Sequence, residues 1–314
     1  PIEEWENNTG TRGGRKPEKQ KFDRELRNQM QHLYQANSDE WDTLYNAGNY
    51  YNEKHHELKK KIDALDKNDP EREKLILLDC ELDMSGEHLT PEANAVNKKF
   101  EQIRDMQTQQ EIQYAKDNVS MLGYDYITQN IRAAVEHYKT DISPITEVYN
   151  KVYKAKYPDH PYTTMIENYI QASTVKEGGQ YIDVTAKDID GKDVKLSGWI
   201  DGKVAVIHLW ASWCGPCRKS GQELIPIYNE YKDKGFTVVG IARENNKESM
   251  ITALEKDNHP WVNLLELNDY NNIWAKYGIG NSGGKDFLVD NTGKIFAVAP
   301  SAEQVREILG NLLN

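Results

Sequence analysis

The segment that most constrains this chain is Cys214-Gly215-Pro216-Cys217, which stands between two stretches of different character. Residues 203–210 are mostly apolar over a length typical of a buried strand. Residues 218–234 place apolar side chains at the spacing of an amphipathic helix. The sequence therefore predicts two cysteines at a strand-to-helix junction, where they can close a small disulfide and reopen it.

The position of Cys214 favours an ionised thiol, because free N–H groups and the helix dipole at the first turn stabilise a thiolate. A zinc site uses the same cysteine spacing but needs two further ligands. The third cysteine, Cys80, lies far upstream, and the only close histidines are His55 and His56, which we expect on a solvated helix face. We therefore predict redox chemistry at the cysteine pair, and neither a metal nor a cofactor.

The motif and four further segments together resemble a known family. The motif stands within Trp210-Ala211-Ser212-Trp213-Cys214-Gly215-Pro216-Cys217-Arg218-Lys219, and the other matching segments are residues 181–184 with 188–197, 234–242 and 287–295. Together they resemble the thioredoxin superfamily, and among its branches the ResA/TlpA-like extracytoplasmic thiol–disulfide oxidoreductases. The resemblance covers about residues 178–314 and not the first half.

The resemblance implies an α/β thioredoxin-like fold, a central mixed sheet flanked by helices, and the sequence pattern agrees with it. Strand-like runs at 204–209, 236–242, 286–290 and 294–299 alternate with helical runs at 217–234, 247–257, 269–277 and 301–312. Parallel strands joined by helices, followed by a hairpin and a last helix, form such a sheet.

The first half of the chain is polar and helical. Apolar residues recur at helical spacing, and three helix starts are marked by a capping residue before proline, at Asp69-Pro70, Thr90-Pro91 and Ser143-Pro144. At 314 residues two domains are expected. We predict a flexible segment over 1–22, an all-α helical bundle over 23–175 and the thioredoxin-like domain over 176–314.

The resemblance also implies a mechanism. Cys214 would attack a substrate disulfide, and the less exposed Cys217 would resolve the mixed disulfide by attacking the Cys214 sulfur. Gly215 and Pro216 would set the turn between them. Trp213 either packs beside the sulfurs and limits access or is an ordinary core residue.

Three positions depart from the family pattern. His208 stands where thioredoxins place a buried acid, six residues before Cys214, and is either a proton acceptor or a plain strand residue. Ser220 replaces a glutamate, so the proton route for Cys217 is in doubt. Gly284 falls on the position of the family's cis-proline, where glycine would allow unusual backbone angles and the close approach of a substrate chain.

The composition of the chain limits the classes of partner that it can bind. A net charge of −11 argues against nucleic acid, and no apolar run reaches the length of a membrane span. Because the chain opens on Pro1 rather than Met, we expect a processed product whose signal or lipid anchor is absent. The resemblance implies a periplasmic or envelope location, protein thiols or disulfides as substrates and a membrane thiol-relay donor. A homodimer stays open.

Two other functions compete with disulfide reduction. A thiol peroxidase would need proline and threonine or serine where this chain has Ile207 and Ala211. A non-enzymatic binding module is favoured by the missing acids and proline, and disfavoured by the intact cysteine pair. Cys80 is either a small buried apolar residue, or a thiol that pairs with Cys214 or forms an intermolecular disulfide.

Overall fold

The computed structural model describes residues 17–67, 69–280 and 283–313. The chain divides into two compact units, one ending at Asp117 and the other beginning at Asn118. Of the segment expected to be a flexible tail, residues 1–16 lie outside the described part, and a helix begins at Pro17. Within the described residues, no helix combines the length and apolar character needed to cross a membrane.

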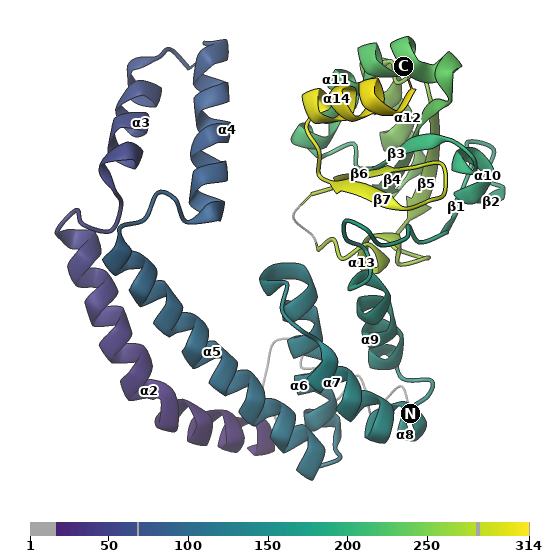
Figure 1. Cartoon of the computed structure of the whole chain (residues 1–314). Coiled ribbons are helices and arrows are strands. Elements are labelled where there is room, and N and C mark those ends of the chain that lie inside the picture. Colours follow the sequence, from purple (N-terminus) through teal and green to yellow (C-terminus); the bar gives the residue numbers. More distant parts are fainter. Residues whose placement is uncertain (1–16, 68, 281–282, 314) are drawn as a thin grey trace. The chain divides into compact units, whose positions relative to one another are not determined.

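The first unit is helical and consists of two helix pairs (Figure 1). Its helices are α2 (Pro17–Asn46), α3 (Glu53–Ala64), α4 (Pro70–Ser85) and α5 (Pro91–Asp117). Helix α2 packs on α5 through a small core around Leu26, Met30 and Ile103. Helix α3 packs on α4 through a separate core around Leu58 and Ile62. The helical prediction is confirmed, but in this unit the helices form two pairs with separate cores rather than one bundle.

Two of the three predicted helix starts have the expected cap. The side chain of Asp69 accepts a hydrogen bond from the Glu71 N–H at the start of α4, and Thr90 Oγ1 accepts one from the Ala93 N–H in α5. At the third start the capping side chain is Asp141, which accepts from the Ser143 N–H. Asp141 and Ser143 are two positions apart, and a short polar side chain at either place can accept from the first turn, so the pattern finds the helix but not the cap.

The second unit contains the sheet and the helices that precede and cover it. Its elements are α6 (Met121–Ala133), η1 (Ala134–Tyr138), α7 (Ser143–Val148), η2 (Tyr149–Tyr153), α8 (Lys154–Lys156), α9 (Pro161–Ala172), β1 (Thr185–Lys187), β2 (Asp193–Lys195), α10 (Ser197–Ile200), β3 (Val204–Trp210), α11 (Gly215–Tyr231), η3 (Lys232–Lys234), β4 (Phe236–Glu244), α12 (Lys247–Asp257), β5 (Val262–Leu267), α13 (Ile273–Lys276), β6 (Lys285–Val289), β7 (Ile295–Val298) and α14 (Ala302–Leu313). Helix α9 packs against α13, so the late helices belong to the same unit as the sheet.

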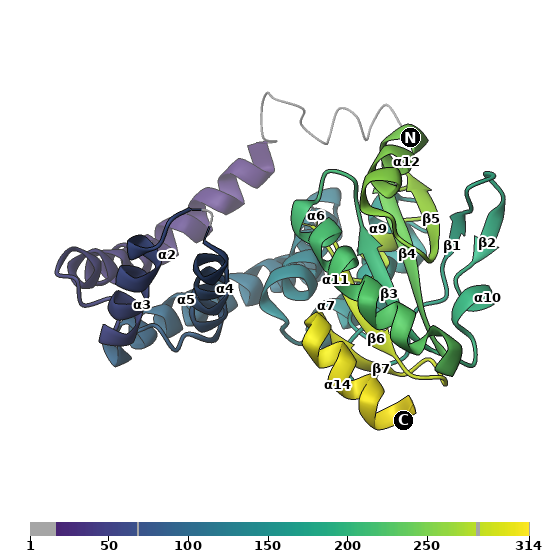
Figure 2. The ribbon, with the colours of Figure 1, turned by 90° about the horizontal axis from the view of Figure 1, so that it is seen from above.

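The sheet has the strand order β2-β1-β5-β4-β3-β6-β7. Strands β3, β4 and β5 are parallel, whereas β6, β7, β1 and β2 join antiparallel to their neighbours. Every residue of the central strand β3 is buried. Because side chains alternate along a strand, Val204 and Val206 pack under α11 and α14, and Ala205 and Ile207 face the core that includes α12 and α13. Figure 2 shows α11 and α14 near each other on one side of the sheet. The mixed α/β sheet flanked by helices is confirmed.

Strand β5 is the element that the sequence pattern missed. Its run from Val262 to Leu267 contains Asn263 and Glu266, two polar residues that weaken an apolar strand signal. Both are buried and have partners: Asn263 Oδ1 accepts from Trp210 Nε1 at 3.1 Å, and Glu266 Oε1 accepts from the Ile273 N–H at 2.8 Å. Burial raises the pKa of Glu266 to about 7.

The Trp210–Asn263 hydrogen bond links β3 to β5 across the intervening strand β4. It passes over Gly240, where a Cβ atom would lie 2.0 Å from Asn263 Oδ1 and 3.0 Å from Trp210 Nε1. Any side chain at this position would occupy the space of the bond. The glycine therefore keeps a gap in β4 that two polar side chains fill.

Candidate active site

The cysteine pair lies where β3 leads into α11, and it is joined as a disulfide. Helix α11 begins at Gly215 with Cys214 as its N-cap, and the Cys217 N–H donates to Cys214 Sγ at 3.3 Å. This is the position that the sequence predicts for Cys214. At a helix N-terminus the same N–H group and the helix dipole favour negative charge on that sulfur.

Cys217 was predicted to be less exposed than Cys214, and the structure does not show this difference. Cys214 is 6% exposed and Cys217 is 8% exposed, so in this disulfide-bonded state the first cysteine is as buried as the second. The backbone at Gly283 explains the cover over Cys214, because a Cβ atom built on it would lie 3.7 Å from Cys214 Sγ.

Gly284 contacts the sulfurs by its backbone. Its N–H donates to Cys217 Sγ at 3.1 Å, a second hydrogen bond from the main chain to the disulfide. A Cβ atom on Gly284 would lie 1.7 Å from the Leu209 carbonyl oxygen, so the close approach expected here is to strand β3. The unusual backbone angle expected at Gly284 belongs instead to Gly283, with φ of 141°.

A buried acid lines the same cleft as the cysteines, and it was not among the residues predicted for the site. Asp286, in β6, is 8% exposed and pairs in register with His208 of β3. His208 Nδ1 lies 2.6 Å from Asp286 Oδ1, and Ser220 Oγ of α11 donates to Asp286 Oδ2 at 2.5 Å. Two of the three positions that depart from the family pattern, His208 and Ser220, thus contact the same carboxylate, which comes from a third element.

The pattern contained a signal for Asp286. It is the polar residue just before the apolar run Phe287-Leu288-Val289, and antiparallel pairing with β3 brings it opposite His208. The pairing of Asp286 with His208 depends on how β6 is aligned with β3, and the residues alone do not specify that alignment. A polar residue on each of two adjacent strands, both predicted to be buried, would have suggested that the two face each other.

Helix α11 approaches His208 closely at Gly221. A Cβ atom there would lie 3.2 Å from His208 Nε2 and 2.6 Å from His259 Nε2. Burial, followed by the nearby His208, lowers the pKa of His259 to about 4, so that ring is neutral at pH 7. Within the described residues, His208 Nε2 has no hydrogen-bond partner, and its contact with Asp286 is made by Nδ1.

The disulfide and the side chains that surround Asp286 line one cleft of about 480 Å³. Its described lining includes Cys214, Cys217, His208, Ser220 and Asp286, together with residues of the 283–286 and 299–300 segments. Of the lining residues described, Asp286 is the one carboxylate. The cleft therefore brings the disulfide and a buried acid to the same solvent-accessible space.

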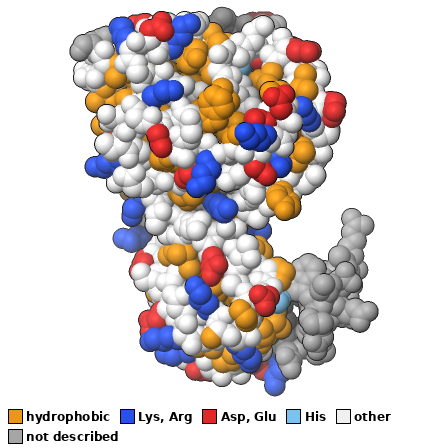
Figure 3. Space-filling view, turned by 90° about the vertical axis from the view of Figure 1, so that its right-hand side faces the viewer, with side chains coloured by type: hydrophobic (Ala, Val, Ile, Leu, Met, Phe, Trp, Pro, Cys, Tyr) orange, Lys and Arg blue, Asp and Glu red, His pale blue; other side chains and the backbone are white. Residues whose placement is uncertain are grey.

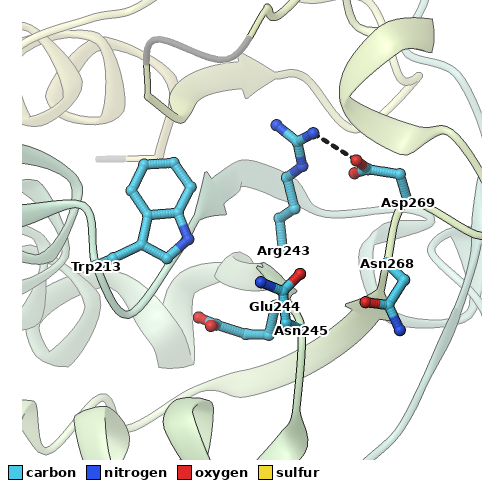
Figure 4. A pocket seen from close by; sticks show the side chains of 6 residues that line it. All are labelled: Trp213, Arg243, Glu244, Asn245, Asn268 and Asp269. Carbon is cyan, nitrogen blue, oxygen red and sulfur yellow. Dashed lines mark hydrogen bonds and ion pairs between the residues drawn. The ribbon is translucent and has the colours of Figure 1, made fainter. Parts of the chain in front are cut away.

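Trp213 stands at the edge of this cleft and also lines a second one. Its side chain is 57% exposed, so it is not a core residue, and its ring lies 6.1 Å from that of the buried Trp274. The second cleft, of about 270 Å³, is otherwise polar; Figure 4 shows Arg243 between Trp213 and Asp269, with the ion pair to Asp269 dashed. The guanidinium also lies 4.9 Å from the Trp274 ring.

Residues 178–298 match the model of the AhpC/TSA family. The matched stretch contains all seven strands of the sheet and is less than half of the chain. Among named proteins, it is 27% identical over 109 residues to the thiol-disulfide oxidoreductase ResA of Bacillus thuringiensis, which covers 34% of this chain and 60% of ResA. The region thus spans less than two thirds of that relative.

Solved structures of the same kind resemble this domain. The thioredoxin domain of a thiol-disulfide oxidoreductase from Bacteroides vulgatus is 29% identical, with a TM-score of 0.41, covering 44% of this chain and 98% of that one. A thiol:disulfide interchange protein from Bacteroides sp. is 28% identical, with a TM-score of 0.41, covering 45% of this chain and 92% of that one. Each likeness covers less than half of this chain.

Proposed function

We propose that this protein is a thiol–disulfide oxidoreductase that reduces disulfides of other proteins through Cys214 and Cys217. The observation that carries the proposal is the bonded cysteine pair at the N-terminus of α11, with main-chain N–H groups donating to both sulfurs. Such donors stabilise a thiolate and lower the cost of forming it. Its relatedness to proteins named thiol-disulfide oxidoreductases supports the same reaction.

The proposed reaction begins with the reduced enzyme. The Cys214 thiolate attacks one sulfur of a substrate disulfide, a new S–S bond forms, and one substrate thiolate leaves and takes up a proton. The Cys217 thiol then loses its proton and attacks Cys214 Sγ, which releases the second substrate thiolate. The substrate gains two electrons, and the enzyme is left as the disulfide seen here.

Asp286 is the group that we expect to accept the Cys217 proton. It lines the same cleft as Cys217, and its two oxygens are held by His208 and Ser220. A carboxylate fixed on both oxygens keeps one orientation, as proton transfer requires. His208 and Ser220 act through Asp286 and are positioning residues in this scheme.

The exposed ring of Trp213 would contact the substrate protein. Aromatic side chains that lie exposed beside a reactive group are common anchors at interfaces. Figure 3 shows acidic and basic side chains interspersed among apolar ones on one face, with no continuous basic area among the described residues in that view. We place the reaction in the periplasm or at the cell envelope, with a membrane thiol-relay protein as electron donor, and a homodimer remains part of this hypothesis.

The reduction potential of the Cys214–Cys217 pair tests the proposal. Equilibration with glutathione, with Cys214→Ser and Cys217→Ser as controls, should give a value near that of thioredoxin, about −270 mV. A value near about −120 mV would make the protein a disulfide donor instead. A pair that does not oxidise and reduce reversibly would exclude both directions, and rapid consumption of peroxide by the reduced protein would favour a peroxidase.

A further inference from the structure

Three side chains with metal-binding atoms meet in the first unit, away from the cysteine pair in sequence. His55 lies in α3, Asp79 in α4 and His88 in the loop that follows α4. They are 9%, 9% and 0% exposed. The expectation that His55 lies on a solvated helix face is therefore wrong, because its ring turns toward α4 and pairs with a histidine 33 positions later, which no local spacing predicts.

The ligand atoms have the spacing of one face of a tetrahedral metal site. His55 Nδ1 lies 3.2 Å from His88 Nδ1 and 3.4 Å from Asp79 Oδ1, and His88 Nδ1 lies 3.6 Å from the same oxygen. A point near the plane of these three atoms is about 2.0 Å from each of them, which is the length of a zinc–nitrogen or zinc–oxygen bond. Such a convergence of two imidazole nitrogens on a carboxylate oxygen is a donor set suited to zinc-like cations.

The surrounding contacts hold the three groups in place. Asn52, the N-cap of α3, donates from its N–H to the His88 carbonyl at 2.8 Å and from Nδ2 to the Glu87 carbonyl. Lys59 Nζ lies 2.6 Å from Asp79 Oδ2, which leaves Oδ1 directed at the histidines. The helix start, the loop and the carboxylate are thus fixed without a metal, as a preformed site requires.

A further observation points to a ligand. Asp79 Oδ1 is buried and has no hydrogen-bond partner within the described residues, although a buried carboxylate oxygen normally has one. His55 and Asp79 keep about a tenth of their side-chain surface exposed, which gives an ion a path inward.

We propose that His55, Asp79 and His88 bind a divalent transition-metal cation of the zinc type, with at least one coordination position left for water or another ligand. Bound metal would join α3, α4 and the following loop, which lie side by side in Figure 1. Among the side chains that the structure describes, this helix pair has a small core around Leu58 and Ile62, so a metal would add a cross-link beside it.

The test uses the full chain with the Cys214–Cys217 disulfide kept oxidised, so that these two thiols do not bind metal. Calorimetric titration with Zn²⁺ should show one saturable site. His88→Gln and His55→Gln should each weaken binding by more than about 100-fold, since loss of an outer-shell partner alone typically costs 10- to 100-fold. His56→Gln, at the exposed neighbour in the same helix, should bind as the wild type does.

Two results would overturn the proposal: no saturable binding by the wild type, or unchanged binding by a folded His88→Gln protein. Because a fully buried residue is replaced, circular dichroism must show that the variant keeps its helices. X-ray absorption on the wild-type Zn²⁺ complex needs no variant. It should show two imidazole rings and no sulfur ligand; a zinc–sulfur shell would place the metal on Cys80 instead and refute the assignment.

Discussion

Replacing Gly284 with alanine should destabilise the thioredoxin-like domain strongly. The added Cβ would lie 1.7 Å from the Leu209 carbonyl oxygen and 2.7 Å from its carbonyl carbon, so either β3 or the segment before β6 must move. Overpacking typically costs 1–3 kcal/mol, and here the obstacle is backbone on a central strand, so we expect about 3 kcal/mol. For a domain of this size that corresponds to a fall of about 6–12 °C in melting temperature.

Thermal unfolding followed by circular dichroism, on the oxidised protein, measures this loss. Gly198→Ala is the matched control, because nothing lies within 4 Å of a Cβ atom built there. Movement of Gly284 would also break its hydrogen bond to Cys217 Sγ, so the reduction potential should shift in the Gly284 variant and not in the control. A melting temperature within about 2 °C of the wild type would refute the steric argument.

Three further predictions follow from buried carboxyl groups. Asp286→Asn should slow release of substrate from the mixed disulfide by about 100-fold or more in single-turnover experiments, because the proposed proton acceptor is lost; Asp233→Asn, on an exposed turn, should not. Asp257→Asn should cost about 1–3 kcal/mol at pH 7, because it removes the charge and one of the two oxygens that accept hydrogen bonds from Arg218. Because hydrogen bonds from Arg218 hold the pKa of Asp257 below its usual range, that difference should shrink as the pH falls below about 4, and a constant difference in acid denaturation curves would contradict it. Burial raises the pKa of Glu266 to about 7, so the wild type should lose about 3 kcal/mol of stability as the pH rises from about 4.5 to 7, and Glu266→Gln should abolish that loss in urea titrations at each pH.

From β3 onward, local pattern was sufficient for every strand except β5 and for the helices α11, α12, α13 and α14. The apolar run of β3, the amphipathic helix after it and the closing hairpin were predicted close to their observed bounds, because each has a periodicity set by its own residues. Strand β5 was missed for a physical reason. Its Asn263 and Glu266 are satisfied by Trp210 and by the start of α13, and neither partner is near them in sequence.

At the site too, features set by neighbouring residues were predicted, and features set by residues distant in sequence were not. Cys214 and Cys217 are three residues apart, so their motif contains its own geometry. The carboxylate that joins His208 to Ser220 comes from Asp286, 78 residues after the histidine, and only strand register brings the two together. The His55–His88 contact was missed for the same reason, since long-range pairing leaves no periodic trace.

The gap at Gly240 has an evolutionary consequence. Since the Trp210–Asn263 hydrogen bond occupies the space of a side chain on β4, the three positions accept change only as a set. A lineage that gained alanine at 240 would first have to lose the buried amide or the indole donor. In related sequences, residues on three adjacent strands, far apart in the chain, should therefore be inherited and replaced together.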